Sequence, residues 1–385
     1  MKISASIPGG NFYLEGIDGH VVRGRQELRD TTEWWFHWRL RMDGLNAGET
    51  WRIEFTDGEV VGPFGPAVRF DGQSWRYLGT HSRVSGACFT FTTPRDCAWA
   101  EFAFSIPYDP TDWAAFVSGI RSLPFVREEI LCETAKGRPA PVLHIGNSNA
   151  HGRLLLTARH HACETTGNYL IEGIVHHLLE RNDPLIYPVL QRYEIIIVPF
   201  MDLDGVIDGD QGKARAPHDH NRDYIDEPLY DTVAQVQSIL NSTKDLIVLD
   251  CHSPYKWGKL NDHAFLVRPN DRRAAFQVAA LGRELRILCS REDPASCLIY
   301  EQLFDKRAQT DWGGNYVSDA QAEALRNEQA TTCNGYAARH GALLAASFET
   351  PYFGTENNPA NPYTIRNLGR KLGLSLEHYL MSNEE

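Results

Sequence analysis

The 385-residue sequence contains no run of about 18 consecutive apolar residues, the length that a membrane-spanning helix requires. Residues 1–16 include one lysine but no long apolar stretch of the kind that forms the centre of a signal peptide. We therefore expect neither a signal peptide nor a membrane span, no membrane partner, and a location in the cytoplasm. The chain also contains no internal repeat and no low-complexity tract.

Positive charge is scarce, with 38 lysines and arginines against 50 aspartates and glutamates and a formal net charge of -12. This balance argues against a nucleic-acid-binding protein that works by neutralising phosphates, so we expect no nucleic-acid partner. The composition leaves the oligomeric state open.

The cysteines lack the CxxC spacing of common zinc motifs and of redox-active pairs. Their scatter favours reduced, mostly buried thiols over a disulfide framework. The eight positions are Cys88, Cys97, Cys132, Cys163, Cys251, Cys289, Cys297 and Cys333.

The length predicts one large catalytic domain with a smaller companion. From residue 11 to about 107, short β-type runs such as TWRIEFT alternate apolar and polar residues between Gly, Asp and Pro, which predicts an antiparallel β domain. Beyond residues 108–125, strand-like and helix-like segments alternate, which predicts an α/β domain with a mixed, largely parallel central sheet flanked by helices. We place the division between residues 1–115 and 116–385.

Three apolar runs of strand length each end in metal-binding or acidic residues. RLLLTARHHACE ends with His161 and Glu164, DLIVLDCHS contains His252, and LLAASFETPY contains Glu349. Because functional residues collect at the carboxyl ends of parallel strands, we expect these side chains to meet at one sheet edge. Two imidazoles and a carboxylate form an open zinc site, and a further carboxylate supplies the base that such a site needs.

The segment at residues 201–224, MDLDGVIDGDQGKARAPHDHNRDY, is long and rich in Gly and Asp, and we expect it to lack regular structure. Arg215 and Arg222, the latter beside Asn221, suggest recognition of anionic groups. A solvated loop with surface arginines is the alternative.

At this point the sequence resembles a known family. HACET, DHNRDY, DCHS and FET occur in the order found in the zinc carboxypeptidases. WWFHWRL, GPFGPAV, WRYLG and FAFSIPY resemble the β-sandwich domain that precedes the catalytic domain in the cytosolic carboxypeptidase branch. The resemblance implies that residues 1–115 form such a sandwich and that residues 116–385 form a zinc carboxypeptidase-like catalytic domain.

The resemblance also implies one zinc ion per chain, with His161, Glu164 and His252 as its ligands. His161 rather than His160 is implied as the ligand, because the family spacing places two residues between the histidine and the glutamate. Glu349 would be the general base that activates the zinc-bound water.

Four further roles follow from the same resemblance. Arg215 would polarise the scissile carbonyl, and Asn221 and Arg222 would hold the terminal carboxylate of the substrate. Asp219 would orient His161 from behind the metal. A mobile tyrosine covers the substrate in this family, and Tyr316 and Tyr336 are both candidates.

The activity implied is that of a zinc-dependent metallocarboxypeptidase, which hydrolyses the C-terminal amide bond of a peptide or small amide that has a free carboxylate. One alternative is a zinc-dependent deacylase of N-acyl amino acids, and another is a non-catalytic binding protein that uses the β domain. Branch members that remove acidic residues have a basic side chain where this chain has Cys333 and Asn334, which leaves the side-chain specificity open.

Overall fold

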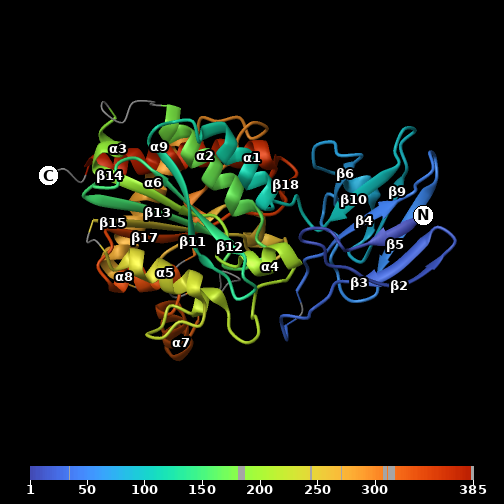
Figure 1. The fold of residues 1–385 in the computed structure, drawn as a ribbon, viewed down its shortest axis with the longest axis horizontal. Helices are drawn as coiled ribbons and strands as arrows, with labels where there is room; N and C mark the ends of the chain where they lie inside the picture. Colours follow the sequence, from blue (N-terminus) through green and yellow to red (C-terminus); the bar gives the residue numbers. More distant parts are fainter. Residues whose placement is uncertain are drawn as a thin grey trace.

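The computed structural model describes residues 1–33, 35–180, 187–242, 245–269, 271–306, 310 and 317–382. Its larger part is built on a seven-stranded mixed sheet (Figure 1). In spatial order the strands are β11 (Val126–Glu133), β12 (Pro139–Ile145), β14 (Tyr193–Val198), β13 (Gly152–Ala158), β15 (Leu246–His252), β17 (Leu344–Glu349) and β16 (Phe265–Val267).

The four central strands, β14, β13, β15 and β17, are parallel to one another. The outer pairings, β11 with β12, β12 with β14, and β16 with β17, are antiparallel. The predicted mixed sheet with a parallel centre is therefore confirmed. Parallel central strands are buried on both faces, which explains why they read as continuous apolar runs in the sequence.

Helices cover both faces of this sheet (Figure 1). Leu154 and Leu156 of β13 face one hydrophobic core, whereas Leu155 faces another. The first core is closed by α1 (Pro110–Ile120), α2 (Thr166–Glu180), α6 (Arg272–Cys289) and α9 (Pro362–Ser382), and the second by α5 (Asp231–Leu240) and α8 (Cys333–Arg339).

The remaining elements of this part are short or peripheral. They are α3 (Pro188–Arg192), α4 (Leu203–Asp208), α7 (Asp319–Ala330), β18 (Gly354–Thr355), β19 (Asn358–Pro359) and the 3-10 helices η2 (His220–Arg222), η3 (Lys259–Asp262) and η4 (Gln302–Phe304).

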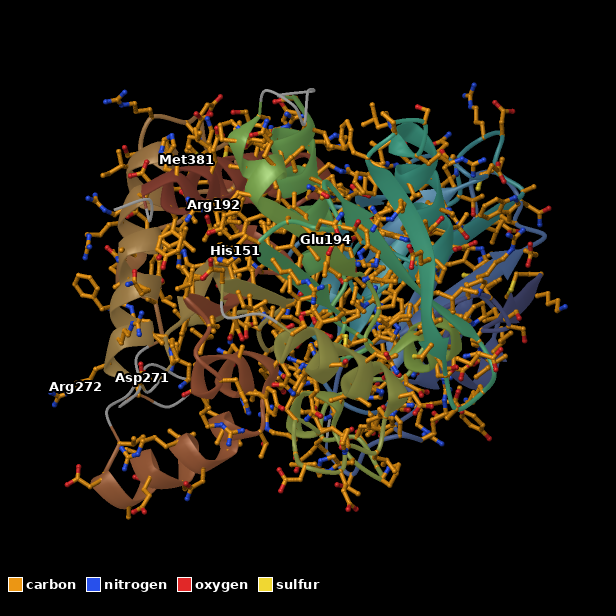
Figure 2. All side chains as sticks on the ribbon, turned by 60° about the vertical axis from the view of Figure 1, so that its left-hand side comes forward. His151, Arg192, Glu194, Asp271, Arg272 and Met381 are labelled. Carbon is orange, nitrogen blue, oxygen red and sulfur yellow. The ribbon has the colours of Figure 1, made fainter. Side chains whose placement is uncertain are left out.

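Helix α6 begins where its sequence provides a capping carboxylate. The side chain of Asp271 accepts a hydrogen bond of 2.8 Å from the backbone N–H of Ala274, which satisfies one of the free donors at the helix start. Figure 2 shows Asp271 and Arg272 at this end of α6, and Met381 near the end of α9.

The N-terminal part contains two five-stranded sheets that share one aromatic core, with Trp38, Phe55, Phe89 and Phe102 among its buried residues. One sheet consists of β1 (Lys2–Ser4), β4 (Arg39–Asp43), β10 (Trp99–Ala103), β6 (Ala67–Phe70) and β7 (Arg76–Tyr77). The other consists of β2 (Tyr13–Asp18), β3 (Val21–Arg25), β5 (Thr50–Phe55), β9 (Cys88–Thr92) and β8 (Arg83–Ser85), with η1 (Thr80–Ser82) before β8.

The pairings of these two sheets are antiparallel, as expected, except that β3 and β5 are parallel.

The expectation that residues 201–224 lack regular structure is wrong in part, because α4 forms there. The side chain of Asp202 caps this helix by accepting a hydrogen bond from the backbone N–H of Gly205 at 2.8 Å. The division between residues 115 and 116 stays a prediction, and in the structure these residues lie inside α1. Within the described ranges, no helix has the length and apolar character needed to cross a membrane.

Candidate metal centre and active site

The sheet brings the predicted metal ligands together at its carboxyl edge. His161 and Glu164 lie in the connection between β13 and α2, and His252 is the last residue of β15. Glu349 ends β17 and pairs directly with His252 in the strand register. Because β13, β15 and β17 are adjacent parallel strands, residues far apart in the sequence end at one place.

The donor atoms of the three side chains converge. The Nδ1 atom of His161 lies 2.8 Å from Oε1 of Glu164, and the Nδ1 atom of His252 lies 2.7 Å from Oε2 of the same carboxylate. One donor atom from each residue lies within 4.8 Å of the others. Two imidazoles and a carboxylate in this arrangement fit the donor set of a zinc site with one open position.

A carboxylate lies behind each histidine. The Nε2 atom of His161 is 3.3 Å from Asp219, and the Nε2 atom of His252 is 2.7 Å from Asp250. Burial alone would raise the pKa of Asp219, but the neighbouring His161 lowers it below its ordinary value. The carboxylate therefore stays ionised, and it lies where it can accept a hydrogen bond from the ring. Asp219 lies beside His161, at the position that the resemblance implied. Asp250 was not predicted, although its position two residues before His252 on one strand places both side chains on the same face.

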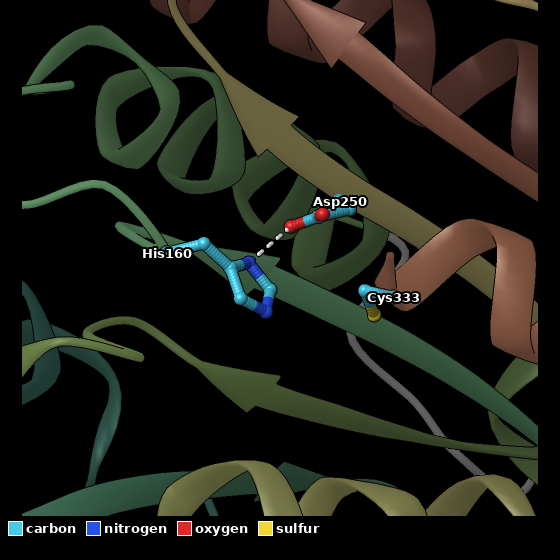
Figure 3. A group of neighbouring side chains, drawn as sticks. All are labelled: His160, Asp250 and Cys333. Carbon is cyan, nitrogen blue, oxygen red and sulfur yellow. Dashed lines mark hydrogen bonds and ion pairs between the residues drawn. The ribbon is translucent and has the colours of Figure 1, made fainter. Parts of the chain in front are cut away.

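The neighbouring His160 belongs to a separate buried cluster with Asp250 and Cys333 (Figure 3). Its Nδ1 atom lies 2.8 Å from Oδ1 of Asp250, and its Nε2 atom lies 2.8 Å from the hydroxyl of Tyr224. Both ring nitrogens are thus paired within the protein. His160 supports Asp250, and through it His252, while His161 faces the candidate metal site.

Glu349 is a buried carboxylate beside the converging donors. Its Oε2 atom has no hydrogen-bond partner in the part of the chain that the structure describes. Burial, together with the charge of Glu164, raises the pKa of Glu349 to about 7. A carboxylate with a free oxygen and such a pKa is suited to accept and return a proton.

The structure does not bring Arg215 to this centre. Its guanidinium forms ion pairs with Asp202 and with Asp210, the latter at 2.8 Å. It lines a different cavity of about 200 Å³, together with His220 and Tyr230. Arg215 therefore does not lie where the resemblance requires a carbonyl-polarising cation.

Lys213 lies there instead. Its Nζ atom is 2.6 Å from Oε1 of Glu164, donates to the carbonyl of Ser253 at 3.1 Å, and lies 5.5 Å from the ring centre of Trp35. Burial alone would lower the pKa of Lys213, but the charge of Glu164 and then those of other acidic groups raise it, so the ammonium stays charged. The sequence did show a second cation in GKAR, but not which one turns inward.

The N-terminal part fixes the loop that carries Lys213. The carboxylate of Asp30 accepts from the backbone N–H of Gly212 at 2.7 Å and from that of Gln211 at 3.1 Å. Gly212 has a φ of +81°, and a Cβ atom there would lie 2.1 Å from the backbone nitrogen of Ala162. Only glycine permits this approach to the segment that carries His161.

The predicted carboxylate-binding pair has other partners in this structure. The amide nitrogen of Asn221 lies 3.2 Å from Nε2 of His252, and its oxygen accepts from the backbone of Cys333 at 3.0 Å. The Nε atom of Arg222 donates to Glu328 of α7 at 3.0 Å. Arg222 still borders the candidate centre, whereas the polar atoms of Asn221 hold its neighbours in position.

Of the two tyrosine candidates, Tyr316 lies outside the described residues. The hydroxyl of Tyr336 accepts a hydrogen bond from the side chain of Asn241 at 2.9 Å. Tyr336 is not among the residues that line the two cavities next to the candidate metal ligands.

Two cavities meet at the candidate centre, and His161, Arg222, Glu328 and Glu349 line both. The smaller has a volume of about 80 Å³ and extends toward Arg268, Lys306, Thr332 and Ser347. The larger has a volume of about 650 Å³ and extends past Lys213 toward Trp35, Pro254, Tyr255 and Asn261.

One segment of the chain matches a known protein family. Residues 123–244 match the family model described as zinc carboxypeptidase (peptidase M14). This segment of the chain is therefore similar to the zinc carboxypeptidases, in agreement with the resemblance in its motifs, and the zinc that this family uses fits the three converging donors.

Relatives and solved structures agree with this assignment. The chain is 26% identical over 153 residues to cytosolic carboxypeptidase 1 of Homo sapiens, a match that covers 35% of this chain and 12% of the human protein. The fold is similar to that of a metallo-carboxypeptidase from Burkholderia cenocepacia, with a TM-score of 0.77, 16% identity and 99% of both chains covered. It is also similar to a metallo-carboxypeptidase from Pseudomonas aeruginosa in complex with (2-guanidinoethylmercapto)succinic acid, with a TM-score of 0.76, 17% identity, and 99% of this chain and 100% of that one covered.

These similarities cover different parts of the chain. The family match includes His161, Glu164 and the loop with Lys213, but it ends before His252 and Glu349. The matched segment spans about an eighth of the length of the human relative. The two structural likenesses extend over the N-terminal sheets as well, and they show the fold.

Proposed function

We propose that this protein is a zinc-dependent metallocarboxypeptidase that hydrolyses the C-terminal amide bond of a peptide with a free carboxylate. The observation that carries the proposal is the convergence of donor atoms from His161, Glu164 and His252 beside the unpartnered oxygen of Glu349. These are the parts that metal-assisted amide hydrolysis requires, at one sheet edge.

His161, Glu164 and His252 would hold the zinc, which would polarise the amide carbonyl and increase the acidity of the attacking water. Glu349 would accept the proton of that water on its free Oε2 atom and then deliver it to the leaving amine nitrogen. Lys213 would donate a hydrogen bond from its ammonium to the carbonyl oxygen as negative charge develops there. We assign this role to Lys213 rather than to Arg215, because ion pairs with Asp202 and Asp210 hold Arg215 away from the centre.

Arg222 is the group that we propose to bind the terminal carboxylate of the substrate. It borders both cavities, and a guanidinium binds a carboxylate through two parallel hydrogen bonds. Its present partner is also a carboxylate, since its Nε atom donates to Glu328 at 3.0 Å. Asn221, whose side-chain oxygen accepts from the backbone of Cys333, lines the smaller cavity beside Arg222 and would be the second donor to that carboxylate.

We also propose that residues 1–115 form a β-sandwich domain and that residues 116–385 form a catalytic domain. Two of the hydrophobic cores support it, since one is built mainly from the N-terminal sheets and another from the central sheet and its helices. The cytoplasmic location stays a prediction.

The test compares the free-acid and C-terminally amidated forms of one peptide substrate, with an N-acyl amino acid series in parallel. We expect the amide to lose about 2 to 4 kcal/mol of transition-state stabilisation, on the order of 30- to 1000-fold in kcat/KM, because a neutral group leaves Arg222 partly unpaired. Removal of zinc by a chelator should abolish hydrolysis, and one equivalent of zinc should restore it.

Three outcomes would contradict parts of this proposal. Equal cleavage of the acid and the amide would rule out the carboxylate requirement. Cleavage confined to the N-acyl amino acids would identify a deacylase. Absence of hydrolysis by the zinc-loaded protein across both series would favour a binding protein.

A further inference from the structure

The two cavities at the candidate centre differ in size and in chemistry. The smaller, about 80 Å³, is bordered by polar and basic side chains that include Arg268 and Lys306. The larger, about 650 Å³, is bordered on one side by Trp35, Pro254 and Tyr255. Because Arg222 and Glu349 line both, a substrate whose carboxylate contacts Arg222 has its scissile amide at the junction.

The wall of the larger cavity is aromatic and comes from both parts of the chain. Trp35 belongs to the N-terminal part and Tyr255 to the connection after β15, and their rings meet edge to face at 5.7 Å. The buried Phe36 packs against both, at 6.1 Å from Trp35 and 5.4 Å from Tyr255. The indole N–H of Trp35 donates to the hydroxyl of Thr31 at 3.1 Å. The wall is therefore fixed before any ligand binds.

Lys213 lies between this aromatic wall and the candidate metal ligands. Its ammonium lies 2.6 Å from Glu164 and 5.5 Å from the centre of the Trp35 ring. If Lys213 binds the carbonyl oxygen, as proposed above, a group attached to the carbonyl carbon would extend toward Trp35 and Tyr255, which line the same cavity as Lys213. Aromatic faces favour apolar and aromatic groups.

We propose that the larger cavity is the subsite for the acyl side of the substrate, and that Trp35 and Tyr255 select an aromatic or large aliphatic group immediately before the scissile bond. The inference rests on the proposed function and assigns its substrate class. It also gives the N-terminal part a direct role in specificity, because Trp35 forms one side of the subsite.

The test uses two acetylated dipeptides that end in alanine, one with phenylalanine and one with alanine before the scissile bond. The unmodified zinc-loaded protein should favour the phenylalanine substrate by at least about tenfold in kcat/KM, because only this side chain covers the aromatic wall. Trp35→Ala should bring the two values within about threefold of each other, mainly through loss on the phenylalanine substrate.

Tyr255→Ala provides a second variant at a side chain that is 41% exposed, whose removal disturbs the core less. It should reduce the same preference. The matched control is Trp99→Ala: Trp99 is a partly buried tryptophan of β10 that packs on Arg41 and does not line the cavity. This control should retain the preference.

Calorimetric binding of ketomethylene analogues of both dipeptides, which cannot be hydrolysed at that bond, provides a measurement independent of turnover. The benzyl analogue should bind more tightly than the methyl analogue, and Trp35→Ala should remove the difference. Equal binding of the analogues by the unmodified protein, or an unchanged preference in both Trp35→Ala and Tyr255→Ala, would overturn the inference. Selective binding without hydrolysis of either substrate would instead contradict the proposed function and leave the subsite supported.

Discussion

Two adjacent histidines have separate tasks in this molecule. His161 turns its Nδ1 atom toward Glu164, whereas His160 points into the protein and bonds with Asp250 and Tyr224. The left-handed backbone of Arg159, with a φ of +65°, immediately precedes this pair, and its guanidinium donates to the carbonyl of Tyr108 at 2.7 Å. The chain thus changes direction where the strand ends, and one imidazole leaves the core.

Glu349→Gln should separate proton transfer from metal binding. The amide keeps the shape of the side chain but cannot accept a proton, so turnover should fall by at least roughly a hundredfold. The zinc content, measured by elemental analysis, should remain about one per chain. His161→Ala is the control that should lose zinc. Near-normal turnover of Glu349→Gln with full zinc would place the base elsewhere.

Lys213→Met should lower kcat by roughly a hundredfold, because the developing charge on the carbonyl oxygen loses its cation. KM should change less, and binding of a phosphonate analogue of the tetrahedral state should weaken with kcat. Lys213→Arg should restore part of kcat and part of the affinity for the phosphonate analogue. Lys136→Met is the control, since Lys136 pairs with Asp208 at a surface position. A normal kcat in Lys213→Met with normal zinc content would exclude the proposed role.

The elements set the geometry between these residues. The register of β15 and β17 pairs His252 with Glu349, and β13 delivers His161 and Glu164 from the other side of β15. A one-residue shift of β17 would turn Glu349 to the opposite face of the sheet. The burial of both faces of these strands holds the register in place.

Helix α7 places Glu328 on Arg222, where we propose that the substrate carboxylate binds. Glu328→Gln removes a competing carboxylate from an exposed ion pair, so KM for free-acid substrates should fall about two- to fivefold. The amidated substrates should change little. The matched control, Glu323→Gln, is an exposed position on the same helix. An unchanged KM for the free acids would argue against Arg222 as the carboxylate site.

Across the whole molecule, the N-terminal part and the catalytic part meet at the loop that carries Lys213. The amide of Asn11 donates to the carbonyl of Gly209, and Gln211 bonds with the backbone of His37 in both directions at 2.8 Å. Together with Asp30, these contacts make the N-terminal sheets a support for the candidate active site.

His37 should make this junction sensitive to acid. Burial lowers the pKa of His37 from 6.5 to about 3. The unfolded chain then binds a proton more readily than the folded chain between these values, so the stabilising contribution is complete above pH 6.5 and is lost as the pH falls toward 3. Relative to His37→Gln, the free energy of unfolding of the native protein should fall by about 1 kcal/mol between pH 6 and pH 5.

Denaturant unfolding at a series of pH values measures this difference. His81→Gln, at an exposed histidine, is the control and should follow the native protein at every pH. Parallel pH profiles for the native protein and His37→Gln would show that His37 is not the group responsible.

The sequence predicted the parallel strands β13, β15 and β17, because strands buried on both faces have continuous apolar runs. It did not predict β11, whose residues VREEILCE form a largely solvent-facing edge strand without a regular alternation of apolar and polar positions. It also missed the short helices α4 and α8, which are stabilised by a capping side chain and by packing rather than by a long periodic pattern.

The sequence by itself predicted the candidate ligands His161, Glu164 and His252 and the candidate base Glu349, because these residues lie at or just beyond the ends of apolar runs that are legible without a structure. Only the tertiary structure decided which cation stands beside them. Lys213 and Arg215 are two residues apart in one loop. Asp202 and Asp210 of the same segment bind Arg215 on one side, and Asp30, from a distant part of the chain, fixes the loop on the other. Hydrogen bonds and ion pairs between segments so far apart leave no local pattern in the sequence.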